Sequence, residues 1–335
     1  MQLLDFSITS LHGFARREVA CRVQLKYEIL EIDYSKKHPR LISTYEAGIF
    51  FIKKQKRMKR IAIQGFEGCF HEMAAKRYFN GENLSLLYCN TFEQVFDKVK
   101  NTDDTIGIVA IENTIAGSLL HNYELLCQSG LEVVGEKKLH ISHSICCLPD
   151  DTWETIHEVH SHPVALMQCR KYLERHPVLK SVEADDTAGA AMNIAKNKLH
   201  GQAAICNAEA ARKFGMKILE EHIEDNKHNY TRFLIITQKN KANELKCLNP
   251  TDKASLAFTI SHECGSLAKV LSIFSFYGIN LTKIQSLPII GREWEYRFYI
   301  DLSFSDYTQY KQSIEAVKPL TSEFINLGEY NDDKN

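Results

Sequence analysis

The sequence predicts an α/β protein that carries a smaller domain of a different plan at its C-terminus. Short apolar segments alternate with amphipathic ones from residue 60 to about residue 238, which is typical of strands alternating with helices around largely parallel sheets. Residues 239–253 are polar and rich in lysine, which indicates a linker. Beyond the linker the predicted order becomes β-α-β-β-α-β, the ferredoxin-like plan.

The alternating region, residues 58–238, is expected to form the first domain. Its strands are predicted at residues 61–64, 105–111, 141–148, 158–161, 203–206 and 234–237, and its helices at residues 72–79, 91–100, 117–128, 165–174, 188–197 and 208–214. Residues 105–111 form one continuous apolar run, as expected for a strand covered on both faces. Gly130 stands where a left-handed helix cap favours glycine.

The C-terminal domain is expected over residues 254–330. Its predicted elements are strands at residues 255–260, 280–287, 295–302 and 323–327, and helices at residues 267–276 and 307–317. Residues 1–57 differ from both domains because they lack a clear helical or strand period. Met58 directly precedes the first predicted strand, so either the natural chain starts at Met58 or residues 1–57 form an ordered extension. Both interpretations stay open.

The composition excludes several classes of protein. The chain has 335 residues, enough for two domains, and a formal net charge of −1, so no overall field draws it to nucleic acid or to an anionic membrane. No apolar run reaches the roughly 20 residues of a transmembrane helix, and the N-terminus lacks the features of a signal peptide. The ten cysteines include no Cys-x-x-Cys pair, which favours a reducing, cytoplasmic location over a disulfide scaffold.

Polar groups and glycines gather at the ends of predicted strands. Gly65 and Gly68 form a turn before a helix whose first amides would favour an anion, although a tight structural turn would also explain them. Glu112, Asn113 and Thr114 follow the apolar run, where open α/β sheets bind ligands, and helix capping is the alternative.

A third group of polar residues is Thr231-Arg232 in the segment 229–233. Arginine pairs with carboxylates through two parallel hydrogen bonds, and threonine can donate to an oxygen, so a ligand with a carboxylate and a leaving oxygen would suit both. A surface salt bridge of Arg232 is the alternative.

Ser161-His162-Pro163 leads into a predicted helix that Pro163 would start, with lining of a ligand site as a secondary role. His157, His160 and His162 cluster in the sequence, but alternating histidines on a strand need not share a face with other ligands. The zinc-protease helix and the Gly-x-Ser-x-Gly elbow of serine hydrolases are absent. No metal site is therefore expected.

In their order along the chain these motifs resemble the prephenate dehydratase family. The matching segments are Gly65-x-x-Gly68, Ile111-Glu112-Asn113-Thr114, Ile141-Ser142-His143-Ser144, Ser161-His162-Pro163, Asp186-Thr187-Ala188 and Asn229-x-Thr231-Arg232-Phe233, and residues 278–284 resemble an ACT regulatory domain. The resemblance covers about residues 60–330. It implies two α/β lobes of the type II periplasmic-binding-protein kind with the active site in the cleft between them, and a homodimer or homotetramer paired through the ACT domains.

The resemblance also implies a reaction and a set of residues. Prephenate would lose carbon dioxide and water to give phenylpyruvate, with no cofactor. Thr231 is expected to hydrogen-bond the departing hydroxyl, Asn113 to orient the ring, and Glu112 to act as an acid only if its pKa is raised. The residues expected to contact substrate are Arg232, Phe233, Thr114, Gly65, Gly68, Ser161 and His162. Arogenate dehydratase, and a non-catalytic binding protein of the same fold, are the alternatives.

For the C-terminal domain the resemblance implies control by L-phenylalanine. The expected effector residues are Gly265, Ser266, Leu267, Asn280, Leu281 and Gln285. The family's Glu-Ser-Arg-Pro segment reads Gln285-Ser286-Leu287-Pro288 here, which removes a carboxylate and a guanidinium and predicts weakened control. The first motif also departs from the family, since Phe66, Cys69 and His71 replace a proline, a threonine and a serine.

Overall fold

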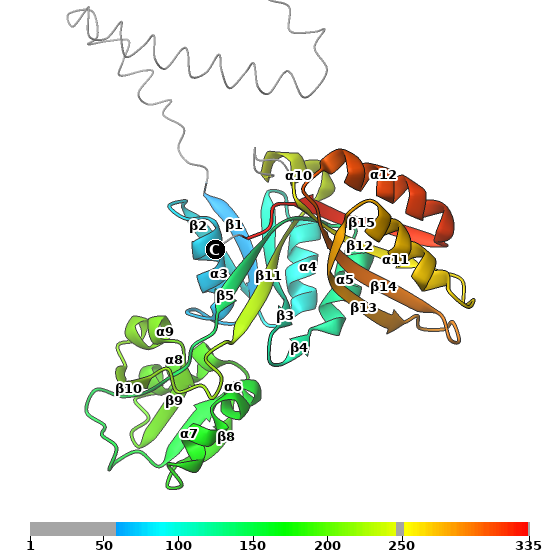
Figure 1. Cartoon of the computed structure of the whole chain (residues 1–335). Coiled ribbons are helices and arrows are strands. Elements are labelled where there is room, and N and C mark those ends of the chain that lie inside the picture. Colours follow the sequence, from blue (N-terminus) through cyan, green and yellow to red (C-terminus); the bar gives the residue numbers. More distant parts are fainter. Residues whose placement is uncertain (1–57, 246–250, 334–335) are drawn as a thin grey trace, which may run out of the picture. The chain divides into compact units, whose positions relative to one another are not determined.

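The structure is a computed structural model that describes residues 58–245 and 251–333. The expectations for residues 1–57, and for residues 246–250 of the predicted linker, lie outside the described residues. Within the described part, the strands pair into three sheets, which define a first lobe, a second lobe and a C-terminal domain (Figure 1). The predicted fold class, a two-lobed α/β region followed by a ferredoxin-like domain, is confirmed.

The first lobe is built on a mixed sheet in which β11 inserts between β3 and β5. Its strands are β1 (Lys59–Gln64), β2 (Leu84–Cys89), β3 (Thr105–Asn113), the short β4 (Gly117–Ser118), β5 (Glu132–His140) and β11 (Tyr230–Thr237), and its helices are α3 (Phe70–Tyr78), α4 (Phe92–Asn101), α5 (Leu120–Ser129) and α10 (Lys239–Leu245). Strands β1, β2 and β3 are parallel, whereas β11 runs antiparallel to both of its neighbours. The apolar run of β3 is buried, as its sequence predicted.

The second lobe lies between β5 and β11 in the sequence, so the chain passes into it after β5 and returns through β11 (Figure 1). It contains β6 (Ser144–Cys147), β7 (Glu158–Ser161), β8 (Lys180–Glu183), β9 (Gln202–Cys206) and β10 (Lys217–Glu221), with helices α6 (Pro163–Gln168), α7 (Arg170–Glu174), α8 (Thr187–Asn197) and α9 (Ala208–Lys213). Strands β7, β8 and β9 are parallel, but β6 and β10 are antiparallel to their neighbours. The expectation of largely parallel sheets is thus correct for only part of each lobe.

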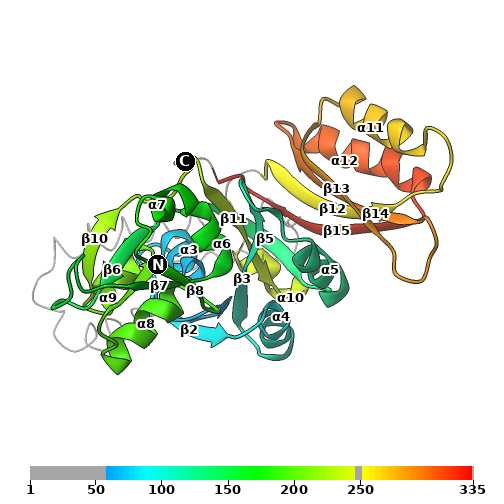
Figure 2. The same cartoon turned by 90° about the horizontal axis from the view of Figure 1, so that it is seen from below.

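The C-terminal domain has the predicted β-α-β-β-α-β order. It consists of β12 (Lys253–Thr259), α11 (Ser266–Phe276), β13 (Asn280–Pro288), β14 (Tyr296–Ser303), α12 (Tyr307–Val317), a 3-10 turn (Lys318–Leu320) and β15 (Glu323–Tyr330), in a sheet ordered β13-β14-β12-β15. Helices α11 and α12 cover one face of this sheet (Figure 2). Side chains from the opposite face, including Ala257, Tyr299 and Leu327, join a core shared with the first lobe.

Several element boundaries differ from the prediction. Residues 239–245, expected to be linker, form helix α10, and Lys253 already belongs to β12. The helix expected from Gly117 begins at Leu120, because Gly117 and Ser118 pair with the end of β3. The single helix expected over residues 165–174 is two helices that break at Cys169. Gly130 has the predicted left-handed conformation, with φ of 71°.

Candidate active site at the junction of the two lobes

The side chains of Asn113 and Thr231 meet where β3 and β11 pair at the end of the first lobe. The two residues are opposite each other in the strand register. The Asn113 Nδ2 group donates to Thr231 Oγ1 at 3.0 Å, while Asn113 Oδ1 accepts from the amides of Ile115 and Ala116 at 2.9 and 2.8 Å. Those two amides fix which end of the Asn113 side chain faces Thr231. Because Thr231 accepts this hydrogen bond, its own proton is available to donate to another oxygen.

Buried amide side chains extend from this pair into the second lobe. Asn229 is fully buried, and its Oδ1 accepts from Asn113 Nδ2 at 2.7 Å. Its Nδ2 donates to Gln168 Oε1 at 3.0 Å, and the same oxygen lies 3.0 Å from His143 Nε2. Burial lowers the pKa of His143, so this ring is neutral near pH 7. The chain of amides therefore joins β3 and β11 of the first lobe to α6 of the second.

The glycine turn of the first lobe contacts the second lobe directly. Gly65 and Gly68 have φ values of 107° and 83°, and a Cβ atom on Gly65 would lie 3.2 Å from Asp186 Oδ2. The Gly68 carbonyl accepts from Asn207 Nδ2 at 2.7 Å. Cys69 is the N-cap residue of α3 and makes no side-chain cap hydrogen bond, and the positive end of the helix dipole lies at this turn.

Glu72 fixes this turn and ties it to the second lobe. Its Oε2 accepts from the Gly68 amide at 2.6 Å and from the Tyr88 hydroxyl at 2.8 Å, and its Oε1 lies 2.9 Å from Lys213 Nζ of α9. Burial opposes ionisation, but Lys76, the Gly68 amide and Lys213 outweigh it and lower the pKa of Glu72 to about 2. The Gly68 amide, which was expected to face substrate, thus donates to Glu72.

Asp186 is a carboxyl group at the junction to which the sequence analysis gave no role. Its Oδ1 accepts from the Gly189 amide at 2.7 Å and so caps α8. Burial raises the pKa of Asp186 despite the Gly189 and Ala188 amides and the nearby His162. Asp186 is thus a carboxyl group beside Gly65 whose ionised form is disfavoured by burial.

Four residues that were expected to contact substrate make hydrogen bonds or packing contacts within the protein. Ser161 is fully buried and donates to the Ile205 carbonyl at 2.6 Å. His162 caps α6, because its Nδ1 accepts from the Val164 amide at 3.2 Å. For both residues the structure favours the structural alternative.

Thr114 and Phe233 complete this set. The Thr114 hydroxyl donates to the His228 carbonyl at 3.1 Å and accepts from the Tyr230 amide at 2.9 Å, so its proton is used to join two strand ends. Phe233 is only 1% exposed and packs edge-on against His71, with ring centroids 4.9 Å apart. It belongs to the core of the first lobe.

Arg232 and Glu112, both expected to act on the substrate, have ionic partners outside the junction of the lobes. Arg232 follows Thr231 on β11, and Glu112 precedes Asn113 on β3. Successive side chains of a strand point to opposite faces of the sheet. Arg232 binds Glu136 and Asp301 instead of lying at the junction, and Glu112 binds Lys283 of the C-terminal domain at 2.9 Å. Neither side chain faces the second lobe.

The expected effector residues separate into two groups. Gly265, Ser266 and Leu267 line a hollow of about 540 Å³ in the C-terminal domain, together with Trp294 and Tyr296. The other three, Asn280, Leu281 and Gln285, lie on β13 at the edge of the sheet and are not among the residues that line this hollow.

The described residues contain neither a membrane-spanning helix nor a metal-binding cluster. Over residues 58–245 and 251–333, no helix is both long and apolar enough to cross a membrane. The same residues contain no group of three or more histidine, cysteine or acidic side chains arranged to hold a metal ion.

Comparisons with known proteins agree with this architecture. The prephenate dehydratase family profile matches residues 61–241. Arogenate dehydratase 1 of Petunia hybrida is 35% identical over 289 residues, which cover 81% of this chain but 66% of that relative. The solved prephenate dehydratase of Staphylococcus aureus is 27% identical with a TM-score of 0.70, covering 81% of this chain and all of that one. GqqA, described as a novel type of quorum quenching acylase, is 27% identical with a TM-score of 0.72, and the match covers 82% of this chain and 98% of GqqA. This chain belongs to the prephenate dehydratase family.

Proposed function

We propose that the protein is a prephenate dehydratase, which removes water and carbon dioxide from prephenate to give phenylpyruvate. The observation that carries the proposal is the Asn113–Thr231 hydrogen bond, which leaves the Thr231 proton free to donate at the junction of the lobes. Removing the side-chain donor from such a site typically costs on the order of 100-fold or more in rate. The family membership and the position of the pair support this assignment together.

The residues at the junction match the charges of the reaction. As the bond to the ring carboxylate breaks, its electron pair enters the ring, carbon dioxide leaves, and the bond to the ring hydroxyl breaks. The departing hydroxide takes up a proton and leaves as water. We assign the hydrogen bond to this oxygen to Thr231 and the proton to Asp186, whose pKa is raised. We assign the second carboxylate to the N-terminal end of α3, where the helix dipole favours an anion, in place of Arg232.

Arogenate is the alternative substrate, because it undergoes the same elimination and the Petunia relative is an arogenate dehydratase. The two substrates differ by an ammonium group in arogenate where prephenate has a keto group. Purified full-length protein is to be assayed with each, following phenylpyruvate and phenylalanine formation. We expect kcat/KM to be at least about tenfold higher for prephenate. The opposite preference would make the protein an arogenate dehydratase, and turnover of neither would favour the binding-protein alternative.

Acyl-amide hydrolysis is a second candidate, because GqqA shares the fold at a similar level of identity. The nucleophiles near the junction do not favour it. The Ser161 hydroxyl is buried and donates to a backbone carbonyl, and burial raises the pKa of the Cys69 thiol to about 12. Neither group is activated for attack on a carbonyl carbon. We therefore prefer the dehydratase.

We further propose that the C-terminal domain is an ACT regulatory domain and that phenylalanine binds in its hollow. The hollow contains three of the expected effector residues and is lined by both apolar and polar side chains. Pairing of two copies through these domains would give the expected homodimer or homotetramer, for which the unpaired edge of β13 offers a surface. A cytoplasmic location stays a prediction from the cysteine pattern, since one relative of Arabidopsis thaliana is named as chloroplastic.

A further inference from the structure

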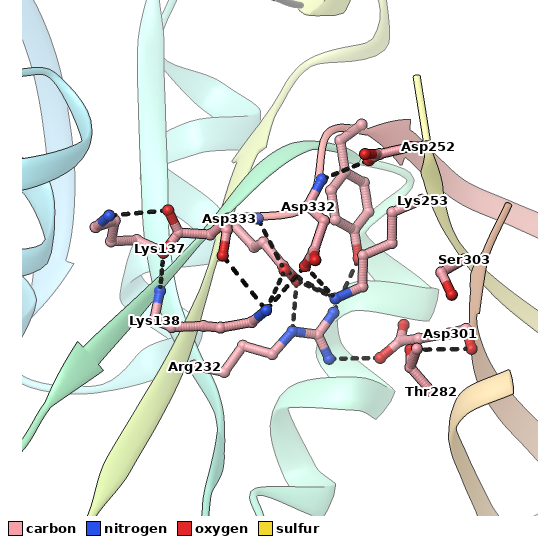
Figure 3. Close-up of polar contacts among 12 residues, drawn as sticks. Lys137, Lys138, Arg232, Asp252, Lys253, Thr282, Asp301, Ser303, Asp332 and Asp333 are labelled. Atoms are coloured by element: carbon pink, nitrogen blue, oxygen red, sulfur yellow. Dashed lines mark hydrogen bonds and ion pairs between the residues drawn. The ribbon is translucent and has the colours of Figure 1, made fainter. Parts of the chain in front are cut away.

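A buried group of charges joins the first lobe to the C-terminal domain. We call it the interdomain cluster, and it comprises Arg232, Lys253 and Asp301, which Figure 3 labels, together with Glu136 and Tyr330. Arg232 Nε donates to Glu136 Oε2 at 2.7 Å, its Nη1 donates to Asp301, and its Nη2 donates to the Tyr330 hydroxyl at 2.9 Å. Lys253 Nζ donates to both Glu136 oxygens at 2.8 and 2.9 Å. Two further carboxylates lie nearby, since Asp332 Oδ1 is 3.2 Å from Lys253 Nζ and Glu112 Oε2 is 3.8 Å from Arg232 Nη1.

Burial makes this arrangement intolerant of change. The side chain of Arg232 is 11% exposed, and those of Asp301 and Glu136 are 4% and 0% exposed. Burial opposes ionisation of Asp301, but Arg232 outweighs it with help from the Ser255 hydroxyl, so the pKa of Asp301 is lowered. Water cannot readily replace a partner that is lost, and an uncompensated buried charge is strongly unfavourable. Movement of Asp301 must therefore move Arg232 or break the cluster.

The cluster lies directly behind the proposed catalytic pair. Arg232 follows Thr231 on β11, and Glu112 precedes Asn113 on β3. The C-terminal domain contacts β11 through the ion pair of Asp301 with Arg232. It contacts β3 through Lys283, whose Nζ lies 2.9 Å from Glu112 Oε1. Both strands that present the pair at the junction are thus held from their opposite face.

Strand β14 connects this contact to the hollow in the C-terminal domain. Tyr296 and Phe298, near its start, line the hollow, and Asp301 lies three residues after Phe298 on the same strand. A ligand that contacts Tyr296 and Phe298 favours the position of β14 that it fits best. Because Asp301 belongs to the same hydrogen-bonded strand, the position of Arg232 depends on that choice.

We propose that Arg232 and Glu112 are positioning residues, through which the C-terminal domain sets the geometry of Asn113 and Thr231 and transmits ligand binding along β14. The inference rests on the proposed dehydratase function. It gives Arg232 and Glu112 a role without contact to substrate. By linkage, substrate at the junction and ligand in the hollow must affect each other's binding equally.

The test is Asp301→Asn in the full-length protein, with kcat and KM for prephenate measured with and without phenylalanine. The variant keeps the shape of Asp301 but removes its charge. We expect kcat to fall by about tenfold or more while KM changes by less than about threefold, because a displacement of about 1 Å at the reacting groups can cost about 100-fold in rate. The response to phenylalanine should weaken as well. A merely structural residue would lower the amount of folded enzyme and leave the kinetic constants of the folded fraction unchanged.

Glu329→Gln is the matched control. Glu329 is also a carboxylate of the C-terminal domain, but its partners Tyr307, Tyr310 and Asn326 belong to that domain, at 2.7, 3.0 and 2.8 Å. We expect kcat to stay within about twofold of the natural protein. An equal loss of kcat in Glu329→Gln and Asp301→Asn would overturn the inference, because general loosening of the domain would then explain both.

Tyr330→Phe decides the matter if Asp301→Asn does not fold. It removes one hydroxyl, which lies 2.9 Å from Arg232 Nη2 and 2.7 Å from Ser255 Oγ, and it preserves every charge of the cluster. We expect a decrease in kcat of about threefold with little change in KM. If the folded variants kept the kcat, the KM and the phenylalanine response of the natural protein, this inference would be overturned but the proposed function would not. A natural protein inactive on prephenate and arogenate would overturn the proposed function, and this inference with it.

Discussion

Replacing Asn113 by aspartate is expected to inactivate Thr231 without removing it. In the natural protein Asn113 Nδ2 donates to Thr231 Oγ1 at 3.0 Å and to Asn229 Oδ1 at 2.7 Å. Aspartate has no such donor. The carboxylate would instead accept the Thr231 proton, so the hydroxyl would no longer donate to a departing oxygen. Turnover should therefore fall by about 100-fold or more, as for loss of a preorganised donor.

The magnitude of the accompanying loss of stability follows from the same contacts. The amides of Ile115 and Ala116 would still donate to one carboxylate oxygen, but the other oxygen would face Asn229 Oδ1. Rotating the Asn229 amide would relieve that repulsion at the expense of its bond to Gln168. A lost or reversed buried hydrogen bond of this kind costs about 1–3 kcal/mol of folding free energy. The variant should thus remain folded at room temperature.

Asn122→Asp separates the two effects. Asn122 lies on α5 and is also buried in the first lobe, and its Nδ2 donates to the Ala110 carbonyl of β3 at 2.7 Å. We expect a similar loss of stability in denaturant titrations but kcat within about threefold of the natural value. If Asn113→Asp keeps natural turnover, or if Asn122→Asp loses as much, the proposed orientation of the Thr231 proton is refuted.

Three further predictions concern other parts of the molecule. Burial lowers the pKa of His71 to about 3, below the value of about 6.5 in unfolded chains. Between these pH values His71 therefore binds a proton in the unfolded state but not in the folded state. Stability should fall by about 1.4 kcal/mol per pH unit as the pH drops between these values, and His71→Gln should lack this component in thermal unfolding followed against pH. Asp186→Asn retains an oxygen that can cap α8 at Gly189 but loses the acid, so it should unfold like the natural protein while kcat falls by about 100-fold. Natural turnover in that variant would exclude Asp186 as the acid. Phenylalanine should inhibit only weakly in a titration of activity, because Gln285 and Leu287 replace the charged pair of the family; tight inhibition of the natural protein would contradict this prediction.

The sequence predicted which residues would matter at the junction better than it predicted where they point. The apolar period placed β3 correctly, and Asn113 and Thr231 do meet. The sequence predicts a strand that begins at Leu234, whereas β11 begins at Tyr230 and includes Thr231 and Arg232. Neighbouring residues of a strand face opposite sides of the sheet. That rule would have required either Thr231 or Arg232 to face away from the second lobe.

The remaining residues of the junction could not have been found from local patterns. Asn229 and Gln168 bond across 61 residues, and Asn207 reaches Gly68 across 139. Their partners come together only because β11 returns from the second lobe and inserts between β3 and β5. A strand order of this kind depends on the packing of the whole chain. The interdomain cluster is hidden for the same reason, since Arg232 and Asp301 are 69 residues apart.

The central claim is that the Thr231 hydroxyl donates to the oxygen that leaves. It is tested most directly by comparing kcat for prephenate in Thr231→Ala and Thr231→Ser. Serine keeps the hydroxyl beside Asn113, whereas alanine removes it. We expect kcat to fall by on the order of 100-fold or more in Thr231→Ala but by less than about tenfold in Thr231→Ser. Near-natural turnover in Thr231→Ala, in a variant that unfolds like the natural protein, would contradict the account.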